Sequence, residues 1–283
     1  MHKPELMEVT NFEVPHDEVK EHRVWSATDE FYDIHVQYLE NHGMEIDQSI
    51  TVGKRSATFL GDYEGNQVCV KIFANQYLPN EVRMLEQIRK LGGHLNIVHP
   101  LHMYQIPFHN CYIYVLVMPF IPCEKSIVEY RQSEDRDFIL EQLLETLVFL
   151  HAQKIMHCDI KPSNLLIDPN TSQLTLIDFE FAETNTCKMY HGTEGFLAPE
   201  IINRQWYDEK VDMFGFGCVV LSLLTGVEES HFPSTTEERD KLWKTVSLTH
   251  PWQPMLQHCL DPNSKTRWSA QTCLDFFTFS RAS

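Results

Sequence analysis

Hydrophobic positions follow two different patterns along the chain. In the first part, apolar residues form short runs rich in β-branched and aromatic side chains, separated by turn residues, which is typical of β-strands. Four runs have this character: 50–53, 57–63, 67–73 and 112–121. A further pair of short apolar runs, at 165–168 and 174–178, flanks the polar turn PNTSQ and predicts a small strand pair.

Helical periodicity appears first at 79–91 and dominates the second part of the chain. The segment 138–153 repeats apolar residues at helical spacing. The segment 211–226 is apolar on nearly every face, which predicts a buried helix. Two or three more helices are expected after Leu242. Strands followed by helices predict an α+β fold with two lobes: an antiparallel small lobe and a mainly helical large lobe.

Residues 1–46 are strongly acidic and poor in apolar side chains until 29–43, which predicts a short amphipathic helix. We interpret 1–46 as an acidic N-terminal extension. It is expected to be solvated or packed on the small lobe rather than to act as a docking motif.

The length, net charge and apolar stretches of the chain narrow the classes of protein to which it could belong. The 283 residues carry a formal net charge of −17, which argues against nucleic-acid and anionic-membrane partners because those need Lys and Arg. The charge is compatible with a basic protein partner or with a merely solubilising surface. The longest apolar stretch, 214–224, is too short to span a membrane.

Eight cysteines are scattered without a C-x-x-C pair, so we expect reduced thiols and no zinc site. Reduced thiols and the lack of an N-terminal signal pattern indicate an intracellular protein, cytoplasmic or nuclear.

Three sequence motifs, which follow one another along the chain, contain the candidate catalytic residues. The string His157-Cys158-Asp159-Ile160-Lys161-Pro162-Ser163-Asn164 follows the long apolar helix, Asp178-Phe179-Glu180 ends the later strand, and the segment 192–200 reads GTEGFLAPE. This order resembles the catalytic loop, magnesium loop and A-P-E motif of eukaryotic-type protein kinases of the serine/threonine type. The resemblance implies a kinase domain over 47–279, with a small lobe at 47–118 and a large lobe at 122–279.

Upstream residues extend the resemblance. Val70-Lys71 ends a predicted strand, as the kinase lysine does, and Glu81 follows on the next predicted helix. In this family such a lysine contacts the α- and β-phosphates of ATP and the glutamate positions it. The resemblance implies that Asp178 and Asn164 hold Mg²⁺, with Mn²⁺ as an alternative metal.

The resemblance to protein kinases also implies which group accepts the phosphate. Asp159 would orient a protein hydroxyl and Lys161 would steady the γ-phosphate. Lys161 and Thr193 are typical of kinases that phosphorylate serine and threonine. The implied partners are therefore protein substrates, and a regulatory protein partner is left open.

Further roles rest on the resemblance alone. The residues expected around the nucleotide are Gly53, Lys71, Cys69, Met118, Phe120, Ile121 and Glu124. Glu200 and Arg267 are expected to form a buried structural ion pair, and Asp212 to hold the catalytic-loop backbone.

Three positions depart from the family pattern. The glycine-rich loop keeps one glycine, Gly53; Glu180 stands where the magnesium loop normally has glycine; and Cys158 replaces the usual arginine. The last change makes activation by phosphorylation of the following segment less expected. The alternatives left open are a pseudokinase acting as a scaffold or allosteric partner, and a small-molecule kinase.

Overall fold

The computed structural model describes residues 7–8, 29–53, 55–74, 78–108, 111–246 and 251–282. The chain divides into two compact units, which we describe separately. Unit 1 comprises Met1–Gly92 and Val98–Phe120, and unit 2 comprises Gly93–Ile97 and Ile121–Ser283.

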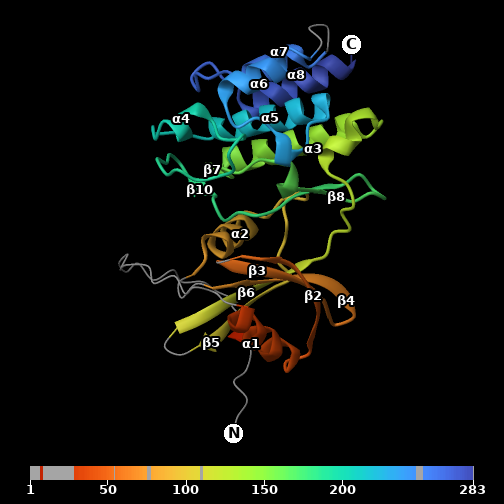
Figure 1. Cartoon of the computed structure of the whole chain (residues 1–283), viewed down its shortest axis with the longest axis vertical. Coiled ribbons are helices and arrows are strands. Elements are labelled where there is room, and N and C mark those ends of the chain that lie inside the picture. Colours follow the sequence, from red (N-terminus) through yellow and green to blue (C-terminus); the bar gives the residue numbers. More distant parts are fainter. Residues whose placement is uncertain are drawn as a thin grey trace. The chain divides into compact units, whose positions relative to one another are not determined.

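Unit 1 is built on one antiparallel sheet with the strand order β1-β5-β6-β4-β3-β2 (Figure 1). Each pairing joins strands in opposite directions, and short turns link β2 to β3 and β3 to β4. Its elements are β1 (Met7–Glu8), α1 (Asp29–Glu40), β2 (Met44–Val52), β3 (Ser56–Tyr63), β4 (Asn66–Phe73), α2 (Asn80–Lys90), β5 (His102–Phe108) and β6 (Cys111–Pro119).

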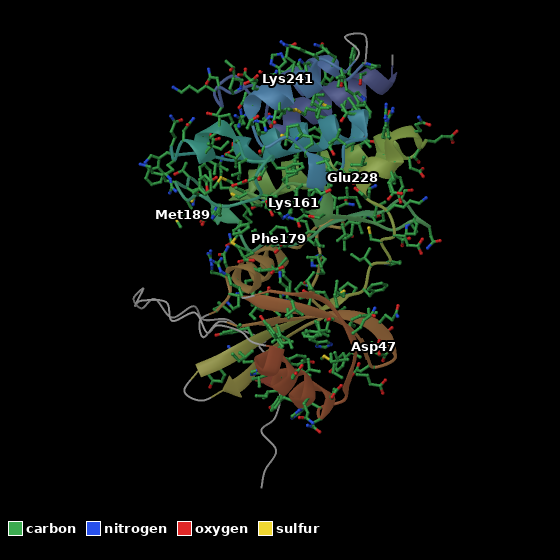
Figure 2. The ribbon with its side chains drawn as sticks, in the orientation of Figure 1. Asp47, Lys161, Phe179, Met189, Glu228 and Lys241 are labelled. Carbon is green, nitrogen blue, oxygen red and sulfur yellow. The ribbon has the colours of Figure 1, made fainter. Side chains whose placement is uncertain are left out.

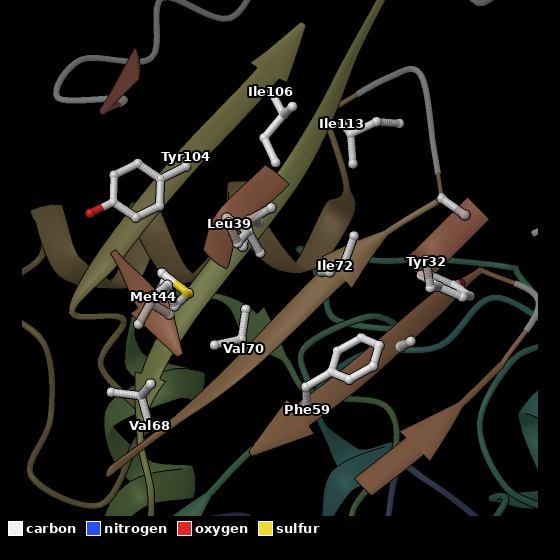
Figure 3. Close-up of a cluster of buried hydrophobic side chains, with 14 residues drawn as sticks. Tyr32, Leu39, Met44, Phe59, Val68, Val70, Ile72, Tyr104, Ile106 and Ile113 are labelled. Carbon is white, nitrogen blue, oxygen red and sulfur yellow. The ribbon is translucent and has the colours of Figure 1, made fainter. Parts of the chain in front are cut away.

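The core of unit 1 joins α1 to one face of this sheet (Figure 3). Tyr32 and Leu39 of α1 are buried with Phe59, Val70 and Ile72 of the central strands. Burying each such side chain stabilises the fold by about 1.5–3 kcal/mol. The amphipathic helix predicted at 29–43 therefore packs against the sheet.

Unit 2 is mainly helical (Figure 1). Its elements are η1 (Ile127–Gln132), α3 (Arg136–Ala152), β7 (Ile155–Met156), η2 (Pro162–Asn164), β8 (Leu165–Ile167), β9 (Leu174–Leu176), β10 (Glu183–Thr184), α4 (Pro199–Ile202), α5 (Lys210–Thr225), η3 (Glu229–His231), α6 (Thr236–Trp243), α7 (Gln253–Cys259) and α8 (Ala270–Ala282).

Helix α5 forms the centre of unit 2, as its uniform apolar character predicts. Every residue from Val211 to Leu223 is buried. Gly215 allows a close approach, because a Cβ there would lie 2.9 Å from the carbonyl oxygen of Ile160. The helix thereby supports the segment that contains the predicted catalytic loop.

The α+β class with an antiparallel sheet unit and a helical unit is confirmed. Sequence reasoning missed β5 and the two-residue strands β1, β7 and β10, and it began β2 several residues too late. The lobe limits at 47–118 and 122–279 remain predictions. Residues 93–97 belong to unit 2, where Ile97 bridges Leu176. No helix in the described ranges has both the length and the apolar character needed for a membrane span.

Candidate active site

One buried carboxylate holds the backbone of the predicted catalytic loop. Asp212, in the first turn of α5, accepts hydrogen bonds from the backbone N–H groups of His157 (2.9 Å) and Cys158 (2.8 Å). His151 of α3 donates through Nε2 to the same carboxylate at 2.9 Å. Burial alone would raise the pKa of Asp212, but the bond and charge of His151, with those of His157, lower it below its usual value. The carboxylate expected to hold this loop is therefore charged and fully engaged with it.

Cys158, next to Asp159, and the predicted metal ligand Asp178 both have left-handed backbones. Cys158 and Asp178 both have φ of 65°, a region that costs a non-glycine residue about 1–3 kcal/mol. Gly192, with φ of 108°, lies against the Cys158 carbonyl, where an added Cβ would be 2.7 Å from the oxygen. Such strain persists only when surrounding contacts enforce it, and it is concentrated at functional sites.

Asp159 lies at the centre of a polar cluster and is only 3% exposed. Its Oδ2 accepts from Asn164 Nδ2 at 3.1 Å and lies 3.1 Å from Lys161 Nζ. Lys161, labelled in Figure 2, also donates to Thr193 Oγ1 at 2.7 Å. The structure thus brings together Asp159, Lys161 and Asn164, as well as the threonine of the GTEGFLAPE segment.

The other carboxylate oxygen of Asp159 is different. Oδ1 is buried and has no hydrogen-bond partner among the described residues. A buried, unpaired carboxylate oxygen is costly unless a ligand or water completes it. This oxygen is therefore the acceptor that the site offers to an incoming donor.

The strand pair β8–β9 places the two predicted metal ligands side by side. Leu165 pairs with Leu176, so the residues just outside this pair are brought together. The backbone N–H of Ile177 donates to the Asn164 carbonyl at 3.0 Å, which sets Asp178 next to Asn164 in space. Because the Asn164 amide nitrogen bonds Asp159, its side-chain oxygen is the atom suited to a cation.

His157 has a structural environment. Its buried ring accepts from the Asp159 backbone N–H at 3.2 Å and donates to the Ile177 carbonyl at 3.0 Å. It also packs edge-on against Phe179, with 4.8 Å between ring centres. With both nitrogens bonded to the backbone, this ring links the catalytic loop to the Asp178 loop instead of acting as a base.

Unit 1 carries the predicted lysine–glutamate pair. Lys71 Nζ on β4 lies 2.5 Å from Glu81 Oε2 on α2, and the Glu81 side chain is only 2% exposed. The Lys71 side chain is 12% exposed, so the pair is largely withdrawn from water and weakly screened. The expectation that Glu81 positions Lys71 agrees with this geometry.

The other nucleotide-site candidates of unit 1 lie on the sheet and its loop. Cys69 of β4 is directly opposite Met118 of β6. The Phe120 N–H donates to the Gln67 carbonyl at 3.3 Å, so this donor is already used within the sheet. The Gly53 N–H closes a turn onto the Ser56 carbonyl at 2.9 Å.

Tyr32 is a contact to this loop that sequence reasoning missed. Its hydroxyl donates to the Gly53 carbonyl at 2.9 Å, and burial raises its pKa to about 12. The N-terminal helix α1 is therefore bonded directly to the loop that carries the single remaining glycine. No local pattern around Tyr32 indicates this contact, because it depends on how α1 packs.

Ile121 and Glu124 lie in the irregular stretch between β6 and η1, and Glu124 is exposed. Glu124 lines a hollow in unit 2 that Ser163, Thr193 and Glu229 also line. Glu124, one of the residues expected around the nucleotide, therefore faces the same hollow as part of the catalytic loop.

Glu200 and Arg267 form the expected buried ion pair. Two guanidinium nitrogens donate to the two carboxylate oxygens at 2.6 and 3.0 Å. The Arg267 side chain has no exposed surface, and it also donates to the carbonyls of Lys210 and Asp261. The pair links α4, the start of α5 and the loop before α8.

Glu229 is a further residue that sequence reasoning missed. Its carboxylate accepts from the Ser163 backbone N–H at 2.8 Å and the Ser163 hydroxyl at 3.0 Å, and it lies 4.0 Å from Lys161 Nζ. Because Glu229 and Ser163 are far apart in the chain, no spacing pattern could have revealed the contact. Glu229 supports the catalytic loop from η3.

Replacing Glu229 with alanine should lower phosphoryl transfer by roughly tenfold or more, because it removes two bonds to Ser163 and the loss of even one charge-assisted bond of about 1.5 kcal/mol corresponds to that factor. Steady-state kinetics of the full chain measure this effect. Glu134→Ala, at an exposed acidic residue, is the control and should have wild-type rates. Equal rates for both variants would show that η3 does not support the loop.

Comparison with known families identifies the fold. The model of the protein kinase domain matches residues 64–277. This match covers well over half of the chain, and the chain belongs to the protein kinase family.

Individual relatives agree with this assignment. The CBL-interacting serine/threonine-protein kinase 10 of Arabidopsis thaliana is 30% identical over 260 residues, covering 81% of this chain and 53% of that protein. The RasGEF domain-containing serine/threonine-protein kinase X of Dictyostelium discoideum is 32% identical over 207 residues, covering 65% and 20%. The serine/threonine-protein kinase cds1 of Schizosaccharomyces pombe is 35% identical over 154 residues, covering 50% and 32%.

The predicted membership of the eukaryotic-type protein kinases is thus confirmed, together with the two-lobed fold class. The chain spans only about a fifth to a half of the length of these three relatives. The residue roles within the site remain predictions.

Proposed function

We propose that this chain is an ATP-dependent serine/threonine protein kinase. The observation that carries the proposal is the buried Oδ1 of Asp159, which has no partner among the described residues while Oδ2 is held by Asn164 and Lys161. A carboxylate fixed in this way presents one oriented acceptor to a substrate hydroxyl. Family membership supplies the reaction class, and this geometry supports the chemistry.

The residues present fit a magnesium nucleotide. Asp178 and the side-chain oxygen of Asn164 are hard oxygen donors on neighbouring stretches of backbone, and such donors suit Mg²⁺ or Mn²⁺. The bound metal and ATP would supply a transferable phosphoryl group with partly neutralised charge. In unit 1, Lys71, held by Glu81, is the cation expected to contact the phosphates.

Asp159 and Lys161 then have different roles in the transfer of the phosphoryl group. Asp159 orients the acceptor hydroxyl and accepts its proton, while Lys161 supplies positive charge where negative charge develops on the γ-phosphate. The bond from Lys161 to Thr193 ties this charge to the segment before the A-P-E motif. That arrangement supports serine and threonine as acceptors.

The partners of the chain and its cellular compartment are proposed only as broad classes. Protein substrates follow from the kinase assignment. One relative is named as CBL-interacting, which makes a regulatory protein partner a reasonable expectation for this chain. The seven cysteines whose side chains are described are all free thiols, in keeping with the proposed intracellular location.

The acceptor class can be tested by transfer of labelled γ-phosphate to a generic basic protein, followed by phosphoamino-acid analysis. We expect label on serine and threonine and none on tyrosine. Label mainly on tyrosine would refute the serine/threonine assignment. ATP with metal that neither raises the melting temperature nor transfers phosphate would favour a scaffold function.

A further inference from the structure

A second group of chemistry-bearing side chains lies outside the proposed active site. One ligand atom each from Glu183, Cys187 and His191 lies within 4.8 Å of the other two. Along an extended chain, Glu183 and His191 would be roughly 26 Å apart. The segment therefore folds back to bring these three side chains together (Met189, which lies in it, is labelled in Figure 2).

The first half of the segment is anchored to the backbone before the catalytic loop. Glu183 pairs with Met156 and Thr184 with Ile155 in the strand pair β10–β7. The Asn185 N–H then donates to the Lys154 carbonyl at 2.8 Å. Glu183 is thus fixed by regular strand pairing.

The second half is anchored to Tyr207. Cys187 and Tyr207 exchange two backbone hydrogen bonds, at 3.1 and 2.9 Å. Gly192, next to His191, is packed against the Cys158 carbonyl. The three side chains therefore come from a backbone that is held on both sides, as a site with defined geometry requires.

Tyr207 also sets the orientation of the His191 ring. Its hydroxyl donates to the Met189 carbonyl at 3.1 Å and lies 2.9 Å from His191 Nε2. With the hydroxyl proton on its bond to the Met189 carbonyl and the Nε2–H tautomer of His191, the Tyr207 oxygen accepts from Nε2. Nδ1 is then the nitrogen with a free lone pair, and an outer partner of this kind is what orients metal-binding histidines.

The donor set selects the kind of ion. A thiolate, an imidazole and a carboxylate suit Zn²⁺, whereas Mg²⁺ and Ca²⁺ prefer oxygen ligands alone. Three protein ligands leave one position of a tetrahedral site for water.

We propose that Glu183, Cys187 and His191 bind one Zn²⁺ ion that fixes the segment between Asp178 and the A-P-E motif. The site lies beside Cys158, the residue that replaces the arginine expected there. The bound cation would hold the segment by coordination, in place of a phosphate–arginine contact. The proposal departs from the expectation drawn from the scattered cysteines, because its ligands are one cysteine, one histidine and one glutamate.

The test is zinc binding by the purified full chain, measured by equilibrium dialysis and by competition with a chromophoric chelator. Wild type should bind one Zn²⁺, and Cys187→Ser and His191→Gln should weaken binding by at least about 100-fold. Tyr207→Phe, which keeps all three ligands, should weaken it by roughly 10- to 100-fold. Cys123→Ser and His99→Gln, which alter a cysteine and a histidine elsewhere, should bind as wild type does.

Co²⁺ gives a second readout that does not depend on any variant. Wild type with Co²⁺ should show a thiolate-to-metal charge-transfer band that Cys187→Ser lacks. Zn²⁺ should also slow amide hydrogen exchange over 183–191 in wild type. The proposal is overturned if wild type binds no Zn²⁺ and shows no such band, or if Cys187→Ser and Cys123→Ser bind equally. These readouts do not require kinase activity, so they are independent of the proposed function.

Discussion

Asp159→Asn should reduce phosphoryl transfer by about a thousandfold, or about 4 kcal/mol of transition-state stabilisation, while the protein stays folded. The reason lies in the donors around Oδ2. Asn164 Nδ2 and Lys161 Nζ both point at that atom, so an asparagine would place its own oxygen there. Its NH₂ group would then occupy the Oδ1 position and could donate to a substrate hydroxyl but could not accept its proton.

The measurement is kcat and KM for ATP in the full chain. A loss confined to kcat, with KM for ATP little changed, is the pattern of an interaction made in the transition state. Asp240→Asn, the same change at an exposed aspartate of α6, is the control and should retain wild-type kinetics. If Asp159→Asn kept transfer within about tenfold of wild type, the assigned role of Asp159 would be wrong.

Glu200→Ala should destabilise unit 2 by about 3–5 kcal/mol, the typical effect of leaving one partner of a buried ion pair uncompensated. The Arg267 guanidinium would remain buried against Phe214, bonded to backbone carbonyls but without a carboxylate hydrogen-bonded to it. Chemical denaturation of the full chain measures the change in the free energy of unfolding.

Two control variants distinguish the effect of breaking the buried Glu200–Arg267 pair from the effect of removing any charged side chain. Glu237→Ala breaks the exposed Glu237–Lys241 pair of α6 and should not change stability measurably. The double variant Glu200→Leu with Arg267→Met removes both charges and should be more stable than Glu200→Ala. If Glu237→Ala and Glu200→Ala were equally stable, the buried Glu200–Arg267 pair would not stabilise unit 2.

Sequence patterns predicted the elements whose stability comes from their own apolar residues. The helices α2, α3 and α5 and the strands β3, β4 and β6 have strong periodicity and lie where the pattern placed them. Strand β5 was missed because its sequence, HMYQIPF, is interrupted by polar residues and Pro107. Its strand geometry depends on pairing with β6.

The residues of the candidate site likewise fall into two groups: those whose proximity follows from the sequence, and those that only tertiary packing brings close. Asp159, Lys161 and Asn164 are close in the sequence, and Asp178 is joined to them by the predicted strand pair. Tertiary packing between distant segments brings Tyr32 to the Gly53 loop, Glu229 to the catalytic loop and Tyr207 to His191. Nothing near them in the sequence distinguishes them from ordinary surface or core residues.

The most direct measurement is transfer of labelled γ-phosphate from ATP by purified protein, with and without Mg²⁺ or Mn²⁺, comparing wild type with Asp178→Asn. We expect metal-dependent labelling of serine and threonine by wild type and at least about a hundredfold less by the variant, since the variant loses a metal ligand. Wild-type protein that transfers no label under any of these conditions would contradict the assignment as an active kinase. Equal labelling by Asp178→Asn would contradict the assigned metal site.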